Sequence, residues 1–126
     1  MKIILTFATT AAIMLFGLFS IAQNKNTAVT SVAGISGDGK ISVEKLLAAE
    51  KIEVSDQKLT IVNYEMSTIV DGKLTAYKGT SAAFTAEMKN VIKNTKPGQN
   101  VYFEMIQAKN KDGSLVKLPG ENLKIE

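Results

Sequence analysis

The chain has 126 residues, 15 basic against 12 acidic side chains and a formal charge of +3, and it contains neither histidine nor cysteine. These absences exclude His-assisted nucleophilic catalysis, thiol chemistry, disulfides, a lipid-modified cysteine and the usual zinc and copper ligand sets. Every basic residue is lysine and the lysines are scattered among acids, which argues against nucleic acid as a partner, because bidentate arginine contacts are impossible.

The first segment has the layout of a secretory signal peptide. Lys2 precedes an apolar run over residues 3–21, and small residues, Ser20 and Ala22, stand before Gln23. We therefore expect cleavage after Ala22, with a periplasmic or secreted product. The alternative is a retained membrane anchor, because the run approaches the roughly 20 apolar residues that span a bilayer.

Residues 23–40 are rich in Asn, Thr, Ser and Gly and predict a flexible leader. A single domain over residues 41–126 is then expected, since one modest core is what a chain of this length supports.

A short stretch at the end of this leader resembles half of a calcium-binding EF-hand loop. Aligning Gly39 with the invariant loop glycine puts Gly34 at the first ligand position and Lys45 at the last. Calcium needs carboxylates at both positions. The sequence therefore predicts a turn leading into a helix, and no metal site.

The helix begins after Ser42, whose side chain can cap it, and covers residues 43–50. Val43, Leu46 and Leu47 have the spacing of one buried stripe.

Residues 58–70 alternate with period two, which indicates a half-buried strand. Its two sides are expected to carry Val62, Tyr64, Met66 and Thr68 on one and Ile61, Asn63, Glu65 and Ser67 on the other. Asp71-Gly72 has the residue types of a tight hairpin turn, so residues 73–78 are expected to pair back against this strand.

A second helix is predicted over residues 80–95, with Thr85 as an alternative cap that would start it one turn later. Four apolar residues share one face of it, and Pro97-Gly98 ends it. These apolar residues are Phe84, Met88, Val91 and Ile92.

The next strand, residues 100–109, changes phase: Val101 and Phe103 are in one register, Ile106 and Ala108 in the other. Such a change predicts a β-bulge near Glu104-Met105. A turn at residues 110–113, a return strand at 115–118, a Pro-Gly turn and a closing strand with Leu123 and Ile125 follow. The order of elements predicts a mainly β, α+β fold: one antiparallel β-sandwich-like domain with short helices against one face or edge.

The run from Lys96 to Glu104, continuing through Ile106, Ala108, Asp112-Gly113 and Leu118, resembles the C-terminal domain of the GldM family, and the helix carrying Phe84, Met88 and Ile92 matches the one ahead of it. The resemblance covers about residues 42–126. It implies a periplasmic, protein-binding domain of the gliding and type IX secretion machinery of Bacteroidetes, with no catalytic residue to transfer.

The chain departs from that family's pattern in two ways. It lacks the long preceding periplasmic domains, and its apolar N-terminus looks cleavable where the family retains a membrane helix. It could therefore be an accessory subunit, a competitor for the same partner, or an unrelated user of the same scaffold.

Catalytic candidates are weak. Ser81 with Lys78, or Glu65 with Glu104 across paired strands, are spacings found in most chains of this size. We therefore predict a non-enzymatic module without cofactor or metal. The alternatives are a small-ligand-binding or peptidase-inhibiting module and a hydrolase that uses Ser and Lys.

The predicted partner contacts are Tyr102, Glu104 and Tyr64. Tyr102 and Phe103 are adjacent and must point to opposite faces of their strand, so a buried Phe103 leaves Tyr102 as an amphipathic contact residue. The alternative is a tyrosine that lies over neighbouring strands.

Overall fold

A computed structural model describes residues 28–126. The predicted signal peptide at residues 1–22 and the first five residues of the predicted leader lie outside this part of the chain. The elements are β1 (Thr30–Ser31), β2 (Asp38–Ile41), α2 (Val43–Ala49), β3 (Glu53–Val54), β4 (Thr60–Val70), β5 (Lys73–Gly79), α3 (Ala86–Lys93), β6 (Asn100–Lys109), β7 (Leu115–Leu118) and β8 (Glu121–Ile125).

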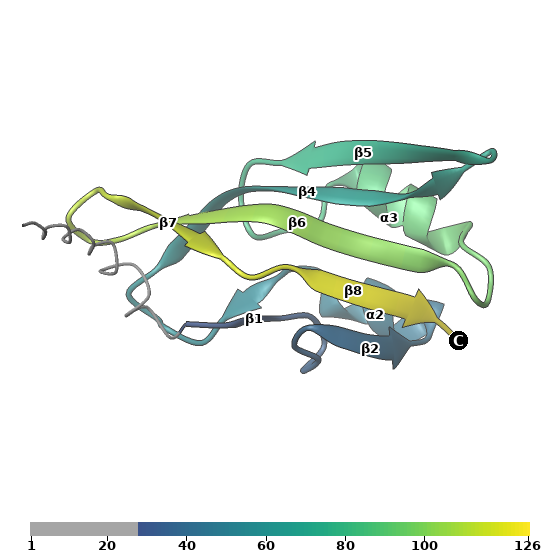
Figure 1. The fold of residues 1–126 in the computed structure, drawn as a ribbon, viewed down its shortest axis with the longest axis horizontal. Helices are drawn as coiled ribbons and strands as arrows, with labels where there is room; N and C mark the ends of the chain where they lie inside the picture. Colours follow the sequence, from purple (N-terminus) through teal and green to yellow (C-terminus); the bar gives the residue numbers. More distant parts are fainter. Residues whose placement is uncertain (1–27) are drawn as a thin grey trace, which may run out of the picture.

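A six-stranded sheet in the order β2-β8-β6-β4-β5 forms one layer, and β7 pairs with β6 beyond the end of β8. All these pairs are antiparallel except β2 with β8. Both helices lie on the same side of the sheet (Figure 1), and β1 pairs with β3 in a small second sheet. The predicted mainly β, largely antiparallel α+β domain with short helices is confirmed.

The core lies between the large sheet and the helices. The ring of Phe103 stacks on that of Phe84, just ahead of α3, with centroids 5.4 Å apart. The ring of Tyr64 on the neighbouring strand β4 has its centroid 6.2 Å from that of Phe103. Met88 and Ile92 of α3 are fully buried against these rings. Burying several large side chains at about 1.5–3 kcal/mol each stabilises the fold without any disulfide, since the chain has no cysteine.

The predicted helix caps explain where both helices begin. Ser42 accepts the backbone N–H of Lys45 at 3.2 Å, so α2 starts at Val43 as predicted. Thr85 accepts the N–H of Met88 at 3.1 Å, which makes Thr85 the start of α3 and the prediction of a helix from residue 80 wrong. The preceding residues are extended instead, because the N–H of Phe84 donates to the carbonyl of Glu50 at 2.9 Å.

The interpretation of residues 23–40 as a flexible leader is wrong for the described part of that range. Asp38–Ile41 forms β2 beside β8, and Val32 is completely buried. This segment is ordered although it has few apolar residues, because backbone hydrogen bonds to β3 and β8 hold it in place. The folded domain therefore begins well before residue 41. The EF-hand-like stretch has a turn at Gly34 and runs into α2 as predicted, but Asp38–Ile41 between them forms a strand.

Two bulges shape the central strands. Between the pairs Glu65–Glu104 and Asn63–Gln107, β4 advances two residues while β6 advances three, and Met105 has a positive φ of 55°. The predicted bulge near Glu104-Met105 is confirmed. A second register shift, between Ile61 and Asn63 on β4, buries Ile61 together with Tyr64, so the predicted placement of Ile61 on the opposite side from Tyr64 is wrong.

Candidate functional site

The side of the large sheet that faces away from the helices is the candidate site, and we call it the helix-free face. Val101 and Phe103 are fully buried against the helices, so the strand pleat turns Tyr102 and Glu104 to the other side. Glu65, Ser67 and Ile69 of β4 and Leu74, Ala76 and Lys78 of β5 are register partners on that same side.

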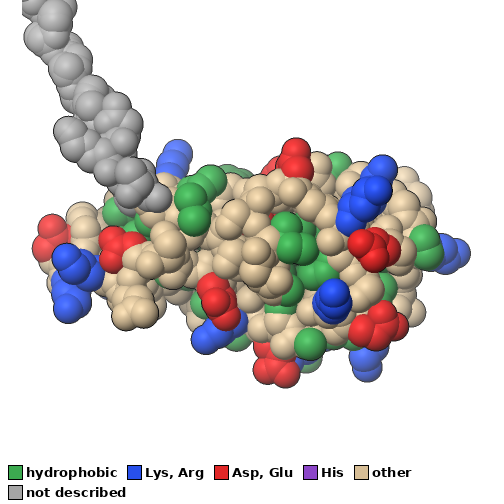
Figure 2. Space-filling view, turned by 90° about the horizontal axis from the view of Figure 1, so that it is seen from below, with side chains coloured by type: hydrophobic (Ala, Val, Ile, Leu, Met, Phe, Trp, Pro, Cys, Tyr) green, Lys and Arg blue, Asp and Glu red, His purple; other side chains and the backbone are tan. Residues whose placement is uncertain are grey.

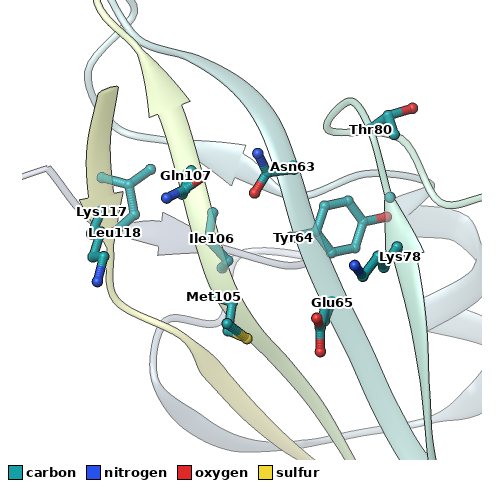
Figure 3. Close-up of a pocket in the computed structure, with 11 residues that line it drawn as sticks. Asn63, Tyr64, Glu65, Lys78, Thr80, Met105, Ile106, Gln107, Lys117 and Leu118 are labelled. Atoms are coloured by element: carbon teal, nitrogen blue, oxygen red, sulfur yellow. The ribbon is translucent and has the colours of Figure 1, made fainter. Parts of the chain in front are cut away.

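A groove crosses the helix-free face from β5 over β4 and β6 to β7, at the position of the β6 bulge (Figure 3). It has a volume of about 520 Å³. Lys78 and Lys117 lie at its two ends, and Glu65 and Met105 project from neighbouring strands between them. Its full lining is Asn63, Tyr64, Glu65, Lys78, Gly79, Thr80, Met105, Ile106, Gln107, Lys117 and Leu118.

A second hollow of about 500 Å³ adjoins the groove toward the β4–β5 turn. Tyr102 and Glu104 line it together with two exposed apolar side chains, Ile69 and Leu74. The amide of Gln99 donates to the hydroxyl of Thr68 at 2.8 Å and to the carbonyl of Ile69 at 2.7 Å. These two hydrogen bonds fix one wall of the hollow to β4.

Met105 is the most unusual residue of this face. Its backbone lies in the left-handed region with φ 55°, and its side chain is 69% exposed. That backbone conformation destabilises the fold by on the order of 1 kcal/mol or more for a non-glycine residue. Because the side chain is exposed, its packing offsets little of this cost. The sequence predicted the bulge but not that its extra residue would present a large apolar group to solvent.

The charges of the helix-free face are unevenly matched. Glu65 lies directly opposite Glu104 on β6 and opposite Lys78 on β5. Within residues 28–126, neither carboxylate has a lysine nitrogen within 4.0 Å. Like charges directly opposite each other on paired strands repel, so this part of the face favours a cationic group from outside.

Two of the three predicted contact residues lie on the helix-free face, and the third does not. Tyr102 is half-buried and Glu104 is exposed. Tyr64 is 1% exposed; its hydroxyl donates to the carbonyl of Ala83 at 2.8 Å, and burial raises its pKa to about 12. The ring is therefore packed on the helix-covered side of the sheet, and a contact of Tyr64 with a partner stays a prediction.

Of the two weak catalytic pairs, Glu65 and Glu104 do lie opposite each other on paired strands, whereas Ser81 is engaged in a turn. The hydroxyl of Ser81 accepts the N–H of Ala83 at 3.2 Å, which is a turn contact. In the part of the chain that the structure covers, no three His, Cys, Asp or Glu side chains are grouped to hold a metal ion. Seen from the side of β1 and β2, lysines and acids are interspersed (Figure 2), as the sequence predicted.

None of the described helices has the length and hydropathy needed to cross a membrane. A comparison with curated proteins found no match. The family model described as the GldM C-terminal domain matches residues 20–126, which is most of the chain and includes β1 and β2. The chain therefore belongs to the GldM C-terminal domain family.

Proposed function

We propose that this domain is a non-catalytic protein-interaction module of the bacterial cell envelope, associated with gliding motility or type IX secretion, and that its helix-free face binds the partner. Membership of the GldM family supports the association with gliding motility or type IX secretion in the envelope. The observation that carries the binding face is Met105, an exposed apolar side chain held in a costly backbone conformation. Strained residues of this kind concentrate at functional sites.

The neighbours of Met105 support the same role. Tyr102, Ile69 and Leu74 add an aromatic and two aliphatic contacts beside it, the last two 45% and 64% exposed. Methionine and tyrosine are enriched where proteins meet, because methionine adapts its shape and tyrosine combines an apolar ring with a polar end. Glu104 lies beside these apolar side chains, so it favours a partner surface in which a lysine or arginine is surrounded by apolar residues.

The edge of the sheet offers a second means of attachment. β5 pairs with β4 and, in the described structure, has no strand on its other side. An extended partner segment can add there as a further strand, with main-chain hydrogen bonds for affinity and Leu74 and Lys78 beside it for specificity. Such a strand would enlarge the helix-free face.

We propose an exported location for the mature domain, after removal of residues 1–22 behind Ala22. The apolar run after Lys2 supports this. The intact mass of the protein from the envelope fraction tests it: a mass that begins at Gln23 is expected, and a mass that includes residues 3–22 would show a retained anchor.

The binding face is tested by placing a photo-crosslinking amino acid at Ala76, an exposed residue of the edge strand β5 on the helix-free face, and exposing the domain to envelope extract. We expect one crosslinked protein species, reduced about tenfold or more by Tyr102→Ala and by Met105→Gly, as for central interface residues. Met105→Gly is expected to leave the free energy of unfolding unchanged or to raise it by up to about 1 kcal/mol, because glycine adopts this φ without strain.

Val29→Ala is the matched control, since Val29 is also an exposed aliphatic residue, 45% accessible, but precedes β1 away from this face. The crosslinked species should be unaffected by it. Crosslinking that survives both Tyr102→Ala and Met105→Gly would remove the helix-free face as the binding site.

A further inference from the structure

A buried carboxyl group joins the first strand of the domain to its last. Glu121, at the start of β8, is 3% exposed and lies opposite Phe103 on the helix-covered side. Its Oε2 is 2.6 Å from the hydroxyl oxygen of Thr30 on β1. The same hydroxyl oxygen is 2.8 Å from the carbonyl oxygen of Pro119, in the corner between β7 and β8.

The two contacts can both be hydrogen bonds in only one protonation state of the Glu121 carboxyl. The threonine hydroxyl has one hydrogen to donate, while a carbonyl oxygen and an ionised carboxylate can only accept. With Glu121 ionised, one of the two short contacts would join lone pairs with no hydrogen between them. With Glu121 protonated, its O–H donates to Thr30 and the Thr30 hydroxyl donates to Pro119, so both contacts are hydrogen bonds.

The surroundings of Glu121 also favour the neutral acid. Its other oxygen, Oε1, is buried and has no hydrogen-bond partner among the described residues. Burial is the main cause that raises the pKa of Glu121, and the negative charge of Asp38 on β2 adds to it. The Thr30 hydroxyl and the Gly37 backbone act in the opposite direction without cancelling this effect.

We propose that Glu121 is a proton-dependent clasp that fastens β1 to the β7–β8 corner when it is neutral and loosens β1 when it ionises. Ionisation removes the hydrogen that one of the two contacts needs and leaves a charge with one unpaired oxygen in the core. β1 is held otherwise by its two-residue pairing with β3, by the Ser36 hydroxyl donating to the Thr30 carbonyl at 2.8 Å and by the buried Val32 that follows it. It pairs over fewer residues than the strands of the large sheet, so it is the element that yields. How firmly the chain ahead of β1 is attached to the domain then depends on pH.

The sign of the pH dependence follows from the direction of the shift. The folded pKa of Glu121 is raised above the ordinary value of 4.5, so the folded state holds a proton that the unfolded state has released. The contribution of the clasp to stability is therefore greatest at low pH. It declines as the pH rises from about the unfolded value through the folded pKa.

The experiment follows the mature protein by NMR across the acid-to-neutral range, recording the carbon-13 shift of the Glu121 carboxyl and the exchange protection of the Ser31 amide. We expect Glu121 to titrate above 4.5 and the protection of β1, corrected for intrinsic exchange, to fall about tenfold per unit of pKa shift over that same pH range. Protection of Val101 in β6 should stay above that of Ser31 at every pH, because a buried central strand opens only when the whole domain unfolds.

Two variants make the result specific. Glu121→Gln keeps the shape and a donor for Thr30 but cannot ionise, so it should abolish the pH dependence of β1 protection. Asp112→Asn changes an exposed acid whose pKa is lowered by its hydrogen bond to Ser114, and it should leave β1 unaffected. Titration of Glu121 at or below 4.5, or titration above 4.5 without any change at Ser31, would overturn the clasp even if Glu121→Gln does not fold.

Discussion

Replacing Gly120 with alanine is expected to lower the free energy of unfolding by about 3 kcal/mol, the upper part of the range for overpacking. A Cβ at this position would lie 2.5 Å from the carbonyl oxygen of Phe103. That oxygen belongs to the backbone of β6, the strand to which both β7 and β8 are paired, so no side chain can move aside. Denaturant unfolding followed by circular dichroism measures the effect.

Gly113→Ala is the control for this prediction. Gly113 has φ 91°, and a Cβ added there would have nothing within 4 Å, so alanine meets only the backbone cost of a left-handed conformation, about 1–2 kcal/mol. Equal losses of stability for the two variants would show that the close approach of the Gly120 backbone to β6 is unimportant.

Gly79→Ala is expected to cost about 2–3 kcal/mol for a different reason. The added Cβ would lie 2.4 Å from Cε1 and 2.5 Å from Cζ of the Tyr64 ring. Moving the ring aside would be costly, because its hydroxyl donates a hydrogen bond to the carbonyl of Ala83 and the ring packs in the core beside Phe103. The measurement is again the free energy of unfolding.

A double-mutant cycle with Tyr64→Leu isolates that clash. In the Tyr64→Leu background the ring is gone, and Gly79→Ala should cost at least about 1 kcal/mol less than in the parent protein, a coupling typical of residues in contact. Strictly additive effects would mean that the ring and the glycine are not in competition for the same space.

Much of the fold was predictable, because the signals that specify it are local. Three of these signals each depend on residues that are close together in the chain. They are the alternation of apolar residues along β4 and β6, the turn at Asp71-Gly72 and the helix cap at Ser42. The pairing of β2 with β8 was not predictable in this way. It joins residues about 80 positions apart through backbone hydrogen bonds, which leave little trace in side-chain pattern.

The candidate site was predictable only in part. Alternation beside a buried Phe103 places Tyr102 and Glu104 correctly on the helix-free face. The burial of Tyr64 could not be predicted, because β4 has apolar residues on both sides and its pattern does not show which side the helices cover. The exposure of Met105 depends on which way the bulge turns its extra residue, a choice made by the pairing with β4.

The position of β8 between β2 and β6 has a consequence for biogenesis. β8 is made after the other strands of the sheet, yet it separates β2 from the rest of them, and the N–H of Glu126 still donates to the carbonyl of Ile41 at 2.9 Å. Deleting residues 121–126 would therefore cost the sheet two strands rather than one. Such long-range closure slows folding, because β2 cannot join the sheet until β8 has been made and has paired with β6.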